Sequence, residues 1–304
     1  MVHMLGAEGA DEVATATVKI HDGMATVICA AVETGQGFST LARQIVQDVL
    51  GIEDVRVAPV DTDQPPAGPA CHGRHTWVSG GAVERAAKMV RTQLLQPLAH
   101  TFGMSAELLQ IADGKITSYD GVLSTTVAET LEGKELWATA QCRPHPTEPL
   151  DADGQGDAFV GLAFCAVRAV VDVDIELGAI RVVELTVAQD VGRVLNPSQL
   201  RARIEAGVTQ GVGAALTENL RTPRGLVRHP DLTGYPLPTA LDTPDIRVVR
   251  LVEERDVIAP FGAKAASAVP VVTTPAAIAS AVRAATGRLV NRLPIRPQQA
   301  VANP

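Results

Sequence analysis

Apolar and polar residues alternate over two pairs of short segments, which is the pattern of half-buried β-strands. The first pair is 14–20 and 25–32, with His21-Asp22-Gly23 as a turn between them. The second pair is 167–175 and 180–187, separated by a short segment that contains a glycine. The sequence therefore predicts two β-hairpins, one in each half of the chain.

Other segments have the apolar period of an amphipathic helix. One follows Gly37 and ends at Leu50, and its expected N-cap is Ser39 or Thr40. A second helix is expected after residues 79–81, where apolar residues again recur one turn apart.

The second half of the chain predicts two long helices. The first begins at Asn196-Pro197, and its glycines indicate that another element packs closely against one face. The last is expected to have Thr274 as N-cap and Pro275 in its first turn, and to end at Gly287. Together the elements predict an α+β fold with mixed sheets and packed helices. The Pro- and Gly-rich segment 144–156 is the expected boundary between two subdomains, 1–148 and 149–304.

Composition narrows the classes of function. A chain of 304 residues with 46% hydrophobic and 20% charged residues is not disordered throughout. Its net charge of −8, without basic runs, argues against nucleic-acid binding. No apolar run reaches the about 20 residues of a membrane helix, so we expect no membrane span. The four cysteines form no CxxC pair and no signal-peptide pattern is present, which together favour the reducing cytoplasm.

The segment Gly35-Gln36-Gly37 lies between a predicted strand and a helix N-terminus. That position presents free backbone N–H groups to an anion, and the Gln36 amide can both donate and accept. The alternative is a tight turn with a solvent-facing glutamine.

Two other loops carry candidate chemistry. The segment 71–75, Cys-His-Gly-Arg-His, lacks the matching ligand pair of a zinc site, so an anion-binding loop built around Arg74 fits better. The segment 260–264 places a glycine and Lys264 before a helix and also suggests an anion site. For each loop an ordinary polar surface loop remains the alternative.

The order of these loops resembles the xanthine dehydrogenase/aldehyde oxidase family of molybdenum hydroxylases. AAVETGQGFSTLARQI at 30–45 is similar to the loop whose Gly-Gln-Gly turn grips molybdopterin in that family. Four more segments follow in the family's order: 73–83, 188–216, 235–246 and 260–287. The resemblance covers only the second half of the family's molybdenum subunit, so we expect a split subunit, a fragment or a diverged relative.

The resemblance implies the cofactor, the partners and the reaction. Molybdenum-molybdopterin would be shared with the N-terminal half of the molybdenum subunit, and 2Fe–2S and FAD would lie on partner chains of a cytoplasmic multi-subunit complex. The reaction would hydroxylate a purine, an N-heterocycle or an aldehyde, and homo-oligomer formation is left open. No residue is expected to ligate metal. The cofactor contacts implied are Gly35, Gln36, Gly37, Thr40, Cys71, His72, Gly73, Arg74 and Arg203.

Two positions depart from the family's pattern. The family places a glutamate next to molybdenum as general base, and this chain has Ala268 there. Losing a general base lowers a rate by about 10²–10⁴-fold. A glutamine that contacts the cofactor is also expected in the long helix, where Arg203 and Ala206 stand. Ala268 favours an alternative, a catalytically silent structural subunit of the same fold. A third reading, an unrelated α+β ligand-binding protein, leaves the ordered segments unexplained.

Overall fold

The computed structural model describes residues 2–5, 13–71, 73–144, 146–252, 260–266 and 268–301. The chain forms two compact units. The first unit comprises Met4–Val160 and Val257–Ala263, and the second comprises Met1–His3, Gly161–Asp256 and Lys264–Pro304. These units are defined by compactness, so the two molybdopterin-binding subdomains 1–148 and 149–304 stay a prediction.

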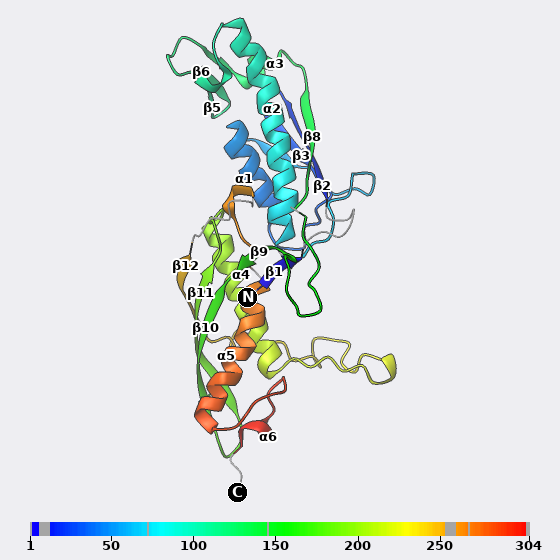
Figure 1. Ribbon diagram of the computed structural model, residues 1–304, viewed down its shortest axis with the longest axis vertical. Coiled ribbons are helices and arrows are strands. Elements are labelled where there is room, and N and C mark those ends of the chain that lie inside the picture. Colours follow the sequence, from blue (N-terminus) through cyan, green and yellow to red (C-terminus); the bar gives the residue numbers. More distant parts are fainter. Residues whose placement is uncertain are drawn as a thin grey trace. The chain divides into compact units, whose positions relative to one another are not determined.

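The first unit is built on a four-stranded sheet with two long helices packed over it (Figure 1). The strand order is β4-β3-β2-β8, and only the β3–β4 pairing is parallel. The elements are β2 (Ala14–His21), β3 (Met24–Ile28), β4 (Val55–Val57), β8 (Leu136–Cys142), α1 (Phe38–Leu50) and α2 (Gly80–Thr101). The first predicted hairpin is confirmed, because β2 and β3 pair antiparallel across a turn in which Asp22 and Gly23 both have positive φ.

The first helix ends where the sequence predicts and begins earlier. Gly51, with φ 59°, closes α1 by donating its N–H to the carbonyl of Gln47 at 2.8 Å. The predicted N-cap is wrong: Gly37 occupies the N-cap position with φ 91°, and Ser39 and Thr40 lie inside the first turn. A glycine has no side chain to cap with, so another group must accept the first N–H groups of α1.

Short elements complete the first unit. A π-helical turn, η2 (His75–Ser79), leads directly into α2. A small antiparallel sheet follows α2, and a separate two-stranded sheet pairs β1 with β9, whose residues are divided between the two units. These elements are η3 (Ala106–Leu108), β5 (Leu109–Ala112), β6 (Lys115–Ser118), β7 (Ser124–Thr126), α3 (Val127–Leu131), β1 (Val2–Leu5), β9 (Phe159–Ala163) and η5 (Pro260–Gly262).

The second unit packs two long helices against a three-stranded sheet of order β10-β11-β12 (Figure 1). The β10–β11 pair is antiparallel, which confirms the second predicted hairpin, and β12 is parallel to β11. The elements are β10 (Cys165–Val173), β11 (Ile180–Asp190), α4 (Pro197–Leu216), η4 (Pro223–Gly225), β12 (Asp245–Val252), α5 (Ala268–Thr286) and α6 (Pro297–Ala300). The mixed sheets and packed helices of both units confirm the α+β class.

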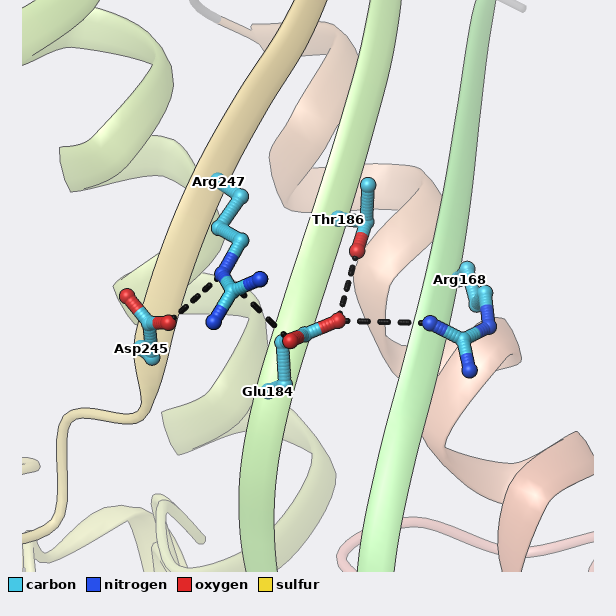
Figure 2. A network of polar contacts seen from close by, with 5 residues as sticks. All are labelled: Arg168, Glu184, Thr186, Asp245 and Arg247. Atoms are coloured by element: carbon cyan, nitrogen blue, oxygen red, sulfur yellow. Dashed lines mark hydrogen bonds and ion pairs between the residues drawn. The ribbon is translucent and has the colours of Figure 1, made fainter.

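The opposite face of this sheet carries a network of charged side chains (Figure 2). Glu184, on the central strand, lies 3.2 Å from Arg168 of β10 and 3.4 Å from Arg247 of β12. Thr186 donates to Glu184, and Arg247 also pairs with Asp245 at 2.7 Å. Single exposed ion pairs add little stability, but this carboxylate joins all three strands.

The last long helix begins seven residues before Pro275, its predicted first residue. α5 starts at Ala268, so the prediction of Thr274 as N-cap and Pro275 in the first turn is wrong. Thr274 is fully buried, and the seven added residues include Val269, which is also buried. Its end is as predicted, because Gly287 has φ 72° and donates to the carbonyl of Arg283.

By length and composition α5 is apolar enough to cross a membrane, which the expectation of no span did not anticipate. Its buried residues instead pack on α4 and the sheet, in a core that includes Ile278 and Val282. These buried residues lie on one face of α5, so that face packs within the unit.

The glycines of α4 allow α5 to approach closely, as the sequence predicts. A Cβ at Gly211 would lie 2.6 Å from the Cβ of Thr274 and 3.3 Å from Cδ of Pro275. Both neighbours are stiff, so neither can rotate away from an added methyl group.

Gly211→Ala should therefore destabilise the protein, although alanine is the better helix former. Overpacking of this kind costs about 1–3 kcal/mol, which outweighs the about 1 kcal/mol that alanine adds to a helix. Thermal unfolding followed by circular dichroism measures the effect. Gln210→Ala, at the exposed neighbouring position, is the matched control and should leave the melting temperature nearly unchanged. A melting temperature of Gly211→Ala at or above wild type would contradict the close approach.

Candidate functional site

The loop between β3 and α1 has a backbone that only glycine adopts readily. Gly35 has φ 92° and Gly37 has φ 91°, both in the left-handed region. The two residues turn the chain sharply into the first turn of α1 and place Gln36 between them.

The carboxylate of Glu33 caps α1 from outside the helix. Its Oε1 accepts the N–H groups of Gly35 at 2.8 Å and Gly37 at 3.0 Å, and its Oε2 accepts that of Ser39 at 3.0 Å. The prediction that this loop presents free N–H groups to an anion is therefore wrong in this structure. The first N–H groups of a helix need acceptors, and the chain supplies its own anion.

These bonds set the charge state of Glu33. Burial is the largest single influence and raises the pKa of the carboxyl, but the backbone N–H groups of Gly37, Ser39 and Gly35 together outweigh it, so the pKa lies below its ordinary value. Glu33 is thus charged at neutral pH and acts as a fixed anion at the start of α1.

The Gln36 amide is fully engaged within the chain. Its Oε1 accepts from the backbone N–H and the hydroxyl of Thr34, each at 2.7 Å. Its Nε2 donates to the carbonyl of Val32 at 2.8 Å and lies 2.6 Å from Nδ1 of His75. Two donors and two acceptor positions are all that an amide offers, so the half-buried Gln36 bonds within the chain and not to solvent, as the alternative expected.

The bond to His75 joins two loops that are far apart in the sequence. Because Gln36 Nε2 donates, Nδ1 of His75 accepts and Nε2 carries the ring hydrogen. His75 is 7% exposed, its ring lies 5.5 Å from that of Phe38, and its Nε2 has no partner among the described residues. Burial lowers the pKa of His75, as does the charge of Arg74, while Glu33 acts in the opposite direction, so the ring is neutral at pH 7.

Arg74 is buried beside His75 and fixes the preceding loop. Its guanidinium donates to the carbonyl of Ala67 at 2.6 Å and packs against Gly68, where a Cβ would collide with it. The backbone N–H of Arg74 bonds to the carbonyl of Cys71, whose side chain is exposed, and Gly73 accepts bonds from the start of η2. The predicted contact His72 lies outside the described residues.

The remaining predicted contacts lie on other elements. Thr40 is exposed on the first turn of α1. Arg203, on α4, and Ala268, the first residue of α5, belong to the second unit. The structure therefore joins the 35–37 and 71–75 loops through Gln36 and His75 and describes the other residues separately.

The suggested anion site at Lys264 is wrong. Its ammonium forms a largely buried ion pair with Asp190 at 2.6 Å, with side chains 13% and 10% exposed. The backbone N–H of Lys264 also bonds to the carbonyl of Val191. Within the described residues no three His, Cys, Asp or Glu side chains gather as metal ligands.

Sequence reasoning missed the roles of Glu33 and His75. An acidic residue just before a glycine-rich turn and helix start is a signal for a carboxylate cap. Nothing local in the sequence pairs His75 with Gln36, because the two meet only through packing of α1 on η2.

Comparison with known proteins places this geometry in a family. The family model described as "Molybdopterin cofactor-binding domain" matches residues 1–244. A putative xanthine dehydrogenase molybdenum-binding subunit of Escherichia coli is 30% identical over 91% of this chain. An aldehyde oxidoreductase molybdenum-binding subunit of the same organism is 31% identical over 90% of the chain. The chain spans 37% and 36% of these two relatives, little more than a third of their length.

Solved structures of molybdenum hydroxylases have the same fold. Quinoline 2-oxidoreductase of Pseudomonas putida superposes with a TM-score of 0.82 and 27% identity, covering 94% of this chain and 37% of its own. The aldehyde oxidoreductase of Desulfovibrio desulfuricans superposes with a TM-score of 0.79 and 26% identity, and the match covers 98% of this chain and 31% of that one.

Glu33→Gln should destabilise the first unit at neutral pH by about 1 kcal/mol, since it removes a charged helix cap. The pKa of Glu33 is lowered by folding, so its stabilisation is complete above the ordinary glutamate pKa and is lost as pH falls through the folded-state value. Thermal unfolding at a series of pH values should show wild type and variant converging in acid. Glu53→Gln, at an exposed position, is the control. A constant difference at every pH would contradict the charged cap.

Proposed function

Because the chain belongs to the molybdopterin cofactor-binding domain family, we propose that it is the molybdopterin-binding part of a molybdenum hydroxylase completed by partner chains. One observation carries the proposal most directly. The Gln36–His75 contact of 2.6 Å brings together the two loops, 35–37 and 71–75, that the family resemblance assigns to one cofactor.

One atom of this site, Nε2 of His75, is suited to bind a group that is rich in hydrogen-bond acceptors. His75 Nε2 carries a hydrogen, is buried and has no acceptor among the described residues. A buried donor without a partner is unfavourable by about 1–3 kcal/mol, which a ligand oxygen can relieve. Molybdopterin, with its phosphate and pterin oxygens, offers such acceptors.

The residues of the site have distinct roles in this proposal. Glu33 holds the 35–37 turn rigid, and Gln36 fixes the tautomer of His75 so that Nε2 is the donor. Arg74 adds positive charge beside it. Gly35, Gly37, Thr40, Cys71, His72, Gly73 and, from the second unit, Arg203 complete the proposed contact set. When bound, the cofactor supplies the molybdenum-centred redox chemistry of hydroxylation.

The substrate class and assembly follow from the same proposal. A purine, an N-heterocycle or an aldehyde is the proposed substrate, in a cytoplasmic complex. The N-terminal half of the molybdenum subunit, a 2Fe–2S subunit and an FAD subunit are the proposed partners. The relatives support this assembly in part, since one is named as the gamma subunit of a 6-hydroxypseudooxynicotine dehydrogenase complex.

A catalytically silent subunit of the same fold is the second candidate, and Ala268 favours it. Ala268 is partly buried against a small apolar cluster with Ala163 and Val269. A methyl group at this position can neither accept nor relay a proton.

His75→Phe should lower the molybdenum bound by the complex, since it removes the unpartnered donor and keeps an aromatic ring beside Phe38. Loss of one supporting contact of a metal site typically weakens binding by about 10–100-fold. The tagged chain is purified with its native partners, and molybdenum per chain is measured by mass spectrometry. His100→Phe, an exposed histidine on α2, is the matched control. A wild-type complex without molybdenum would overturn the proposed function.

Ala268→Glu should raise hydroxylase activity in the molybdenum-loaded complex by up to about 10²–10⁴-fold, the value of a general base. Activity is measured with a panel of purines, N-heterocycles and aldehydes. Ala268→Gln has nearly the same shape and no basic group, so it should show no gain. Equal activity of both variants and wild type at full molybdenum loading would favour the silent subunit.

A further inference from the structure

A segment of the second unit between α4 and β12 protrudes from its own unit. Every residue from Leu220 to Gly234 is exposed. Figure 1 shows this segment, in yellow, leaving the C-terminal end of α4 and extending away from α4 and α5. We call residues 219–234 the arm.

The base of the arm is held firmly at the end of α4. The hydroxyl of Tyr235 donates to Glu218 at 3.1 Å, and the backbone N–H of Glu218 bonds to the carbonyl of Gly213 at 2.8 Å. Pro238 packs on Gly213, where a Cβ would lie 2.9 Å from its ring. The arm therefore begins and ends at one fixed point.

The arm itself is folded back as a tight turn. The N–H of Arg228 bonds to the carbonyl of Arg221 at 2.9 Å. At the tip, Arg224 has φ 57° and Gly225 has φ 81°, the paired positive φ values of a hairpin turn. A Cβ at Gly225 would meet nothing within 4 Å, so the tip stands in open space.

The side chains that this arm presents are apolar as well as basic. Leu220, Leu226 and Leu232 are 64%, 73% and 78% exposed. Three leucines on one short protrusion are unfavourable in water and mark an interaction surface. The arm also has three arginines, Arg221, Arg224 and Arg228, against one aspartate, in a chain of net charge −8. Its partner should offer apolar recesses flanked by carboxylates.

We infer that the arm docks the chain onto the rest of the molybdenum subunit, the portion that the relatives contain and this chain does not. This inference rests on the proposed function. The family model extends to residue 244 and so includes the arm, whereas the chain covers only 37% of the relatives' length. The rest of each of those subunits is longer than this chain and provides a surface that could cover the three exposed leucines.

The test compares the arm with an equally exposed leucine elsewhere in the same unit. The double variant Leu226→Ser/Leu232→Ser removes the two most exposed leucines of the arm. Leu177→Ser is the matched control, because Leu177 is 73% exposed, as Leu226 is, and lies in the turn between β10 and β11. All three tagged chains are purified from the native host, and co-purifying chains are identified and quantified by mass spectrometry.

The double variant should lose the chain that matches the relatives' remaining portion by about 100-fold in affinity, since each buried leucine contributes about tenfold or more. The control should retain it. Circular dichroism and melting temperature should be unchanged in both variants, because the substituted side chains contact little within the chain. Arg224→Glu/Arg228→Glu should weaken the same association in a salt-dependent way.

Three outcomes would overturn the inference: equal retention by the double variant, a wild-type chain that purifies without such a partner, or release of only a second copy of this chain. The last would make the arm a self-association element. Molybdenum content separates this result from the proposed function. If the wild-type complex contains molybdenum and the arm variants still retain the partner, the role of the arm is refuted and the proposed function stands.

Discussion

The candidate site depends on how the first N–H groups of α1 are satisfied. A helix start leaves such groups without partners, and here glycine at the N-cap has no side chain to offer. Glu33 supplies the acceptor, which fixes the turn on both sides of Gln36. In that turn the amide of Gln36 bonds to Val32, Thr34 and His75. One carboxylate thus holds the turn from which Gln36 contacts a histidine on another element.

The same principle operates in the second unit with other partners. Asn196 caps α4 by accepting the N–H of Gln199 at 3.0 Å. The largely buried pair of Lys264 and Asp190 fixes the segment that leads toward α5. Breaking a largely buried pair leaves an uncompensated charge, which is unfavourable. In both units, groups that the sequence suggested for anion binding, the N–H groups at 35–37 and the Lys264 ammonium, bond to carboxylates of the chain itself.

Local patterns predicted the elements well, because their causes are local. The turn at Asp22-Gly23 and the helix ends at Gly51 and Gly287 depend on positive φ values. Glycine adopts these values readily, so its position in the sequence indicates them. Helix starts were harder. Capping by Glu33 acts across several residues, and the start of α5 is set by burial of Val269 rather than by Pro275. The Gln36–His75 contact and the Lys264–Asp190 pair arise from tertiary packing, which no local spacing reveals.

The polar loops and the arm each have side chains that need a binding partner, and the two kinds of partner differ. Among the described residues of the loops, the buried donor His75 Nε2 has no partner, while the arm leaves apolar and basic side chains in water. A buried donor favours a ligand that brings oxygen acceptors into the protein, whereas exposed leucines favour a protein surface. The two needs are independent, because they arise in different units of the chain. The silent subunit proposed as the second candidate would retain the need for a protein partner at the arm. Assembly and catalysis can therefore be lost separately, and the presence of a partner says nothing by itself about turnover.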